Sequence, residues 1–134
     1  MKALALDLGR ERTGIAVSDP TGTVVRPLAV IRRIDTPEGT AALHAVLAQE
    51  APEVIVIGEP LLMSGVAGEQ AHHARSFAGR LRTRVEARVV LSDERLSTTE
   101  AERLRRDGAA QAELDSVAAC VILDSWLRAQ AGAA

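Results

Sequence analysis

The period of the hydrophobic residues changes once along this chain, and that change constrains the fold more than any other feature. Three runs rich in Leu, Ile and Val, at 2–8, 13–18 and 24–34, are separated only by short polar links. Consecutive strands with such tight connections favour an antiparallel meander. From Thr36 onward the apolar residues instead recur at helical spacing, in segments that alternate with short strands.

The second half of the chain predicts helices that connect further strands. Thr36 and Pro37 form a helix start, with threonine as the N-cap and proline at the first helical position. Ser97 to Glu100 form a capping box, and the helix that follows is expected to end near Gly108. The remaining segments are a strand at 53–57, a helix at 69–82, a strand at 87–91 and a helix at about 112–129. This order predicts an α/β fold with a mixed five-stranded sheet, three antiparallel strands followed by parallel strands, flanked by helices.

The length and composition fit one domain. The chain has 134 residues, of which 47% are hydrophobic, and this is enough to form a core. We expect a single domain over residues 1–130 and a flexible tail over 131–134. No apolar run approaches the roughly 18 residues of a membrane span, and the N-terminus lacks a signal-peptide pattern. With a single cysteine, Cys120, these features predict a cytoplasmic protein without a membrane partner.

The basic residues are unevenly distributed along the chain. The formal net charge is −2, yet nine arginines and only five acidic residues fall between Arg75 and Arg106. All basic residues except Lys2 are arginines, whose planar fork suits phosphate contacts. A coding bias that replaces lysine by arginine would explain their number but not their clustering. A basic surface for nucleic acid is therefore one interpretation of the pattern.

Acidic residues occur at three places where ligand sites tend to form. Asp7 ends the first predicted strand, Asp93 and Glu94 follow the strand at 87–91, and Asp115 lies near the start of the last helix. The carboxyl ends of parallel strands are common ligand sites. Each position also has a structural explanation, as a turn cap, an exposed ion-pair loop or an acid favoured by the helix dipole. Taken together, the three positions predict one cleft lined by carboxylates.

Such a cleft fits divalent cations better than other cofactors. Mg²⁺ binds few carboxylates and keeps water in its coordination shell. Two such ions about 4 Å apart activate water and stabilise the leaving oxygen of a phosphodiester. The sequence contains no Cys-x-x-Cys, no His-Glu-x-x-His and no Gly-Lys-Ser/Thr loop that would favour another chemistry. The residues themselves thus favour metal-dependent hydrolysis of nucleic acid.

Four sequence blocks then resemble the YqgF/RuvX family, relatives of the RuvC Holliday-junction resolvases. They occur in the family's order and span nearly the whole chain, which makes the combined match specific. The blocks are Ala5-Leu6-Asp7-Leu8-Gly9 with 12–19, Val56-Ile57-Gly58-Glu59-Pro60 with Met63-Ser64-Gly65, the segment 93–102, and 114–119 with Ile122-Leu123.

The resemblance implies a ribonuclease H-like fold and a nuclease that depends on Mg²⁺ or Mn²⁺. The substrate it implies is Holliday-junction DNA, the 5′ end of pre-16S rRNA, or both. By position, Asp7 is the first metal ligand and catalytic residue, and Asp115 is the ligand on the last helix. Asp93 or Glu94 supplies the second acidic position. Which of the two points inward depends on strand alternation, which the sequence leaves open, and we favour Glu94.

The chain departs from the family pattern around its second block. The family usually has Gly-Leu-Pro followed by Asn-Met-Asp-Gly, whereas here Glu59, Leu62 and Ser64 replace the Leu, Asn and Asp. Glu59 falls where the related resolvases keep a catalytic glutamate, so it is a candidate additional ligand. A solvent-facing loop residue is the other interpretation. Glu11 stands where the family commonly has lysine and removes a positive charge beside Asp7.

The candidate nucleic-acid contacts are Arg12, Arg95, Arg75 and Arg80. Arg12 and Arg95 flank the acidic positions, where they would either neutralise phosphate charge or hold the carboxylates. Arg75 and Arg80 would either follow a phosphate backbone or belong to a solvated helix face. The absence of Tyr, with one Phe and one Trp, favours recognition of shape over base stacking. The alternatives left open are a non-catalytic nucleic-acid or ribosome-assembly protein, DNA versus RNA, and a homodimer.

Overall fold

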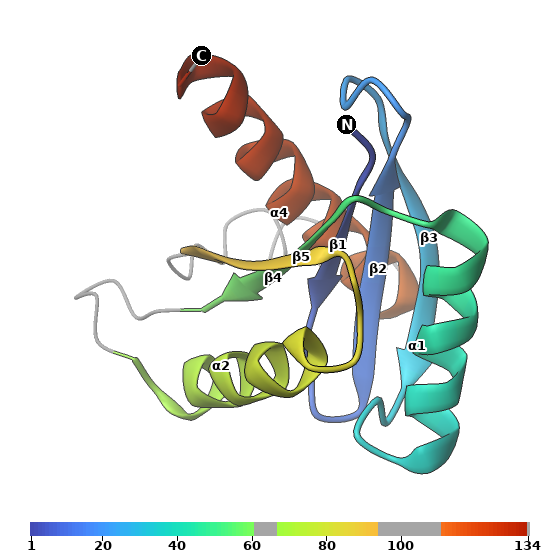
Figure 1. Ribbon diagram of the computed structural model, residues 1–134. Helices are drawn as coiled ribbons and strands as arrows, with labels where there is room; N and C mark the ends of the chain where they lie inside the picture. Colours follow the sequence, from blue (N-terminus) through green and yellow to red (C-terminus); the bar gives the residue numbers. More distant parts are fainter. Residues whose placement is uncertain (61–66, 94–110, 134) are drawn as a thin grey trace.

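The protein forms a five-stranded mixed sheet covered by helices on both faces (Figure 1). The computed structural model describes residues 1–60, 67–93 and 111–133. The strand order is β3-β2-β1-β4-β5. The strands are β1 (Ala3–Asp7), β2 (Arg12–Ser18), β3 (Val25–Arg32), β4 (Val54–Glu59) and β5 (Arg88–Asp93).

The pairing of the strands confirms the predicted architecture. β1 pairs antiparallel with β2, and β2 pairs antiparallel with β3. β1 then pairs in parallel with β4, and β4 in parallel with β5, so both parallel connections need a crossover helix. β1 is the central strand, and its carboxyl end lies on the same side of the sheet as the carboxyl ends of β4, its neighbour, and β5, the next strand.

The structure describes three helices. They are α1 (Pro37–Glu50), α2 (Glu69–Arg82) and α4 (Gln111–Ala133). The N-cap prediction for α1 is confirmed, because the Thr36 hydroxyl accepts a hydrogen bond from the Gly39 backbone N–H at 3.1 Å. Among the described residues, no helix is both long and apolar enough to cross a membrane.

The sheet separates two hydrophobic cores. Leu4 and Leu6 of β1 belong to the larger core, which contains the apolar faces of α1 and α2. Ala3 and Ala5 point to the other face, where α4 packs through Ala119, Leu123 and Trp126. Successive strand residues alternate between faces, so the position of any strand residue follows from its neighbours. Small residues on the α4 side allow that helix to lie close to the strands.

The helix α4 runs antiparallel to β1. A Cβ placed on Gly22 would lie 3.5 Å from Leu127 Cδ2 and 3.1 Å from the Met1 carbonyl oxygen. The C-terminal part of α4 therefore lies near the start of β1, as Figure 1 shows. It follows that the N-terminal part of α4 lies toward the carboxyl end of β1. Cys120 packs at the margin of the same core.

Several boundaries differ from those the sequence predicts. β4 continues through Gly58 to Glu59, and β5 continues to Asp93, because these residues extend the parallel pairing by two positions. Asp93 is therefore the last strand residue and does not lie in a loop after the strand. The last helix reaches Ala133, beyond its expected end at Ala129. The helix expected from the capping box at 97–100 lies outside the described residues.

Candidate active site

Asp7 is the last residue of the central strand and lies between two glycines. Its partner on the antiparallel side is Gly14 of β2. On the parallel side, Gly58 directly follows Ile57, the partner of Leu6. A glycine has no side chain, so neither neighbouring strand projects a group beside the carboxylate. Asp7 itself is half-buried, and both glycines beside it are buried.

The carboxylate of Asp7 belongs to the face of the sheet covered by α4. Leu4 and Leu6 face α1 and α2, so Asp7 alternates to the side of Ala3 and Ala5. The N-terminal part of α4 approaches the same end of this face. Asp115 precedes the buried Ala119 and Ile122 by four and seven residues, which places these three positions along one side of the helix. The side chain of Asp115 itself lies outside the described part.

Asp93 and Glu59 lie on the opposite face of the sheet. They are direct partners in the parallel pair of β4 and β5. Each lies two residues after a core residue, Ile57 or Leu91, and so faces the same side of the sheet, the side covered by α1 and α2. Asp93 is exposed there, two strands away from Asp7. The backbone arrangement therefore brings Asp7 toward α4 and separates it from Asp93 and Glu59.

An ion pair holds Glu59 against α2. Arg75 Nε donates to Glu59 Oε2 at 2.5 Å, and the carboxylate is largely buried, with 13% of its side chain exposed. This hydrogen bond raises the pKa of the Arg75 guanidinium above its ordinary value. The arrangement gives Glu59 a structural role in joining β4 to α2.

The predicted set of ligands is only partly described. Glu94, Arg95, Leu62 and Ser64 lie outside the described residues, so their roles stay predictions. Among the side chains that the structure describes, at 1–60, 67–93 and 117–132, no three His, Cys, Asp or Glu residues gather closely enough to hold a metal ion. Asp7 nevertheless has the chemistry of a ligand for a hard divalent cation, because it offers carboxylate oxygens.

Two of the predicted nucleic-acid contacts form internal ion pairs. Arg75 binds Glu59, and Arg80 Nη2 lies 3.1 Å from Asp35 Oδ1. Asp35 also contacts His73 Nε2 at 2.8 Å, so it joins the segment before α1 to α2. The sequence did not predict this network, because Asp35 is 38 residues from His73 and 45 residues from Arg80 in the chain. Arg12, in contrast, is exposed at the start of β2.

Sequence reasoning also missed the two glycines beside Asp7. Gly14 and Gly58 lie 44 positions apart in the chain, and only the strand register brings them to the same carboxylate. The available signal was a glycine inside each of two apolar strand segments. Glycine within a strand often marks a close approach by a ligand or by another part of the backbone.

The sheet order and the position of Asp7 define an α/β protein with a ribonuclease H-like fold. Two solved structures support this fold. The fowlpox virus resolvase in complex with Holliday-junction DNA matches with a TM-score of 0.59 and 12% identity, covering 97% of this chain and 99% of that chain. The Thermus thermophilus RuvC structure matches with a TM-score of 0.52 and 18% identity, covering 98% of this chain and 97% of that chain.

The sequence comparisons then assign the family. The profile described as "RuvX: Holliday junction resolvase" matches residues 1–129. A protein of Anaeromyxobacter sp. (strain Fw109-5) is 43% identical, covering 95% of this chain and 96% of the relative. One of Synechococcus sp. (strain JA-3-3Ab) is 41% identical, covering 93% and 82%. Both are named "Putative pre-16S rRNA nuclease". The chain belongs to the RuvX family, and this membership supports a nuclease role.

Proposed function

We propose that this protein is a divalent-metal-dependent nuclease that hydrolyses phosphodiester bonds in structured nucleic acid. The observation that carries the proposal is the position of Asp7, at the end of the central strand between Gly14 and Gly58. This carboxylate lies on the face covered by α4, in a chain of the RuvX family. At these two register positions the neighbouring strands place no side chain next to the carboxylate.

Asp7, Glu94 and Asp115 are the proposed metal ligands. A bound Mg²⁺ or Mn²⁺ would activate water and neutralise charge on the leaving oxygen. The protein's own contribution is to hold Asp7 on a rigid strand and to orient α4 through Ala119 and Leu123. Arg12, which is exposed two residues before Gly14, is a proposed phosphate contact.

The second acidic ligand is proposed as Glu94, in preference to Asp93. Asp93 has the alternation of Leu91 and belongs to the face covered by α2, whereas Asp7 belongs to the face covered by α4. A residue that binds the same metal ion as Asp7 is therefore expected to be Glu94, the other member of this acidic pair. Glu59 lies on the face of Asp93 and is held by Arg75, so it is not assigned as a ligand.

The proposed substrates are branched DNA and precursor rRNA, which the protein would recognise by shape and backbone. The chain has only two aromatic residues, Phe77 and Trp126, and both are buried, with 8% and 7% of their surface exposed. Base stacking on aromatic side chains is the usual way to bind single strands. Because both rings are occupied in the cores, folded or branched substrates are favoured.

A cleavage assay with matched substrates tests the proposal. The wild type and Asp7→Asn are compared on a four-way junction, a linear duplex and a precursor rRNA fragment, with Mg²⁺, with Mn²⁺ and with EDTA. We expect metal-dependent product from the wild type and loss of cleavage in the variant, by more than about a hundredfold, because even indirect changes at metal sites cost 10- to 100-fold. Glu11→Gln, an exposed acid four residues away, is the control. Full activity of Asp7→Asn, or activity in EDTA, would contradict the proposal.

A second candidate function is a non-catalytic nucleic-acid or ribosome-assembly protein with the same fold. The altered second block favours it, because Glu59 forms a structural ion pair with Arg75. Salt-sensitive binding without a metal-dependent product on any of the three substrates would support this function. A cytoplasmic location and a homodimer also stay predictions. Sedimentation with and without the junction tests the dimer.

A further inference from the structure

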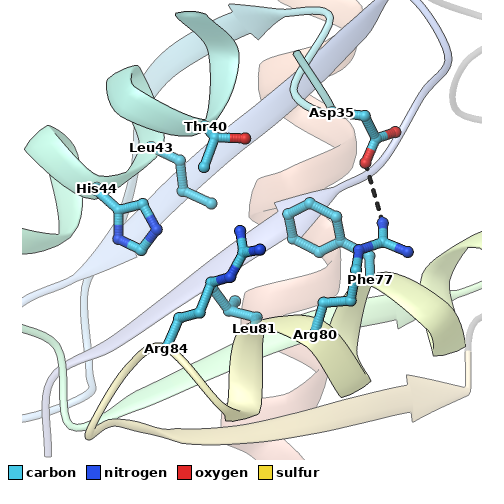
Figure 2. A pocket seen from close by; sticks show the side chains of 8 residues that line it. All are labelled: Asp35, Thr40, Leu43, His44, Phe77, Arg80, Leu81 and Arg84. Atoms are coloured by element: carbon cyan, nitrogen blue, oxygen red, sulfur yellow. Dashed lines mark hydrogen bonds and ion pairs between the residues drawn. The ribbon is translucent and has the colours of Figure 1, made fainter. Parts of the chain in front are cut away.

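A small polar pocket lies between α1 and α2, on the face of the sheet opposite to Asp7 (Figure 2). Its volume is about 140 Å³. We call it the α1–α2 pocket. Its lining residues are Asp35, Thr40, Leu43, His44, Phe77, Arg80, Leu81 and Arg84.

The single acidic residue of the pocket is already engaged by other groups. Asp35 Oδ1 lies 3.1 Å from Arg80 Nη2, and Asp35 Oδ2 lies 2.8 Å from His73 Nε2. Arg80 also donates to the Ser76 hydroxyl at 2.8 Å, and its guanidinium lies 5.9 Å from the centre of the Phe77 ring. Arg80 and Asp35 thus largely neutralise each other.

Arg84 supplies a positive charge that this network does not neutralise. Within the described part of the chain, the side chains of Arg84 and His44 form no hydrogen bond and no ion pair. Figure 2 shows the Arg84 guanidinium turned toward α1, between His44 and Phe77. His44 is half-buried and faces it from α1. Two nitrogen-bearing groups from different elements therefore converge on one small space.

The floor of the pocket strengthens its attraction for an anion. Leu43, Phe77 and Leu81 are buried members of the larger core. The apolar floor keeps water from the inner side of the pocket, where charge interactions are stronger, while Arg84 itself is exposed to solvent. The planar fork of arginine binds oxyanions through two parallel hydrogen bonds. A neighbouring imidazole can donate a further hydrogen bond.

We propose that the α1–α2 pocket binds a phosphate group, with Arg84 and His44 as its ligands. Its volume is below the roughly 300 Å³ of ordinary small-molecule sites, so it fits one anionic group better than a whole nucleotide. The phosphate belongs either to a nucleic-acid backbone or to a free phosphate. The pocket is separated from Asp7 by the sheet, so phosphate binding does not require the proposed nuclease activity.

Titration with inorganic phosphate tests the pocket directly. The ring resonances of His44 are followed by NMR at constant ionic strength in the wild type, Arg84→Gln and Arg88→Gln. Arg88 is a matched control, because it is an exposed arginine that alternates with Val90 onto the face covered by α4. We expect saturable shifts in the wild type and in Arg88→Gln, and their loss in Arg84→Gln. Circular dichroism checks that both variants are folded.

A second measurement identifies the source of the phosphate. Duplex binding is measured at several salt concentrations for the same three proteins, in the Asp7→Asn background without metal. If the group belongs to a nucleic-acid backbone, Arg84→Gln lowers affinity and reduces the salt slope by about one. Unchanged duplex binding, with loss of inorganic phosphate binding, assigns the pocket to a free phosphate. Absence of saturable phosphate binding by the wild type, or equal binding by Arg84→Gln, overturns the proposal.

Discussion

Gly39, in the first turn of α1, lies directly against the carbonyl oxygen of Arg33, the residue that follows β3. A Cβ on Gly39 would overlap this oxygen and would lie 2.7 Å from Ile34 Cα. Arg33 itself has a left-handed backbone with φ of 47°, which turns the chain sharply from strand to helix. The close contact lets α1 begin next to the sheet.

We predict that Gly39→Ala destabilises the protein by about 1–3 kcal/mol, because the added methyl group meets backbone atoms that have little freedom to move. Gly79→Ala in α2 is the matched control, since nothing lies within 4 Å of its Cβ position. There we expect a gain of about 0.5–1 kcal/mol from the better helix propensity of alanine. Urea denaturation measures both, and equal effects of the two substitutions would contradict the argument.

Glu50 joins three elements at the other end of α1. Its Oε1 lies 3.1 Å from Lys2 Nζ and 3.6 Å from Arg26 Nη2, and its side chain is 9% exposed. We predict that Glu50→Gln lowers the free energy of unfolding by about 1–2 kcal/mol, because the buried carboxylate no longer pairs with the partly buried Lys2 and the exposed Arg26. Glu11→Gln removes an acid from an exposed pair with Arg33 and should cost less than about 0.5 kcal/mol. Thermal unfolding at low and high salt provides the comparison.

Asp19 gives a prediction about pH. The hydroxyl of Thr21 and the backbone N–H groups of Val24 and Thr23 donate to its carboxylate and hold its pKa well below the ordinary range. A lowered pKa in the folded state stabilises the protein above the unfolded pKa of about 3.9, and this contribution is lost as the pH falls. Asp19→Ala should therefore be less stable at neutral pH, by a margin that narrows below about pH 4. A constant margin from pH 7 to pH 2 would refute this.

The two neighbouring acids Asp93 and Glu94 give a prediction about activity. Under the proposed assignment, Glu94→Gln removes a metal ligand and lowers cleavage by more than about a hundredfold. Asp93→Asn should change cleavage by less than about tenfold, because Asp93 alternates onto the face away from Asp7. The measurement is single-turnover cleavage at saturating metal. The reverse order of effects would exchange the two roles.

The order of strands and helices could be predicted from the sequence because each element has a local pattern. The start of α1 follows from Thr36 and Pro37, and the bounds of α2 agree with the prediction at both ends. The ends of β4 and β5 could not be predicted. Gly58 normally weakens a strand, and only the pairing of Glu59 with Asp93 extends both strands past it.

The candidate site was predictable only as a set of acidic positions. Asp7 stands out because it ends an apolar strand, but its face of the sheet depends on the register with β2 and β4. The partnership of Glu59 with Arg75 depends on how α2 crosses the sheet, and no local pattern encodes that crossing. Long-range packing therefore determines which of the predicted acids lie near Asp7.

The chain has one cysteine, and it lies on the helix that carries Asp115. Cys120 is half-buried beside Val25 and Val121, and burial raises the pKa of its thiol. Alkylation requires the thiolate, so reagents should react slowly while α4 is docked and faster whenever it lifts from the sheet. The rate at which Cys120 is alkylated in the unmodified protein therefore reports how often this helix opens. Mass spectrometry measures that rate without any engineered label.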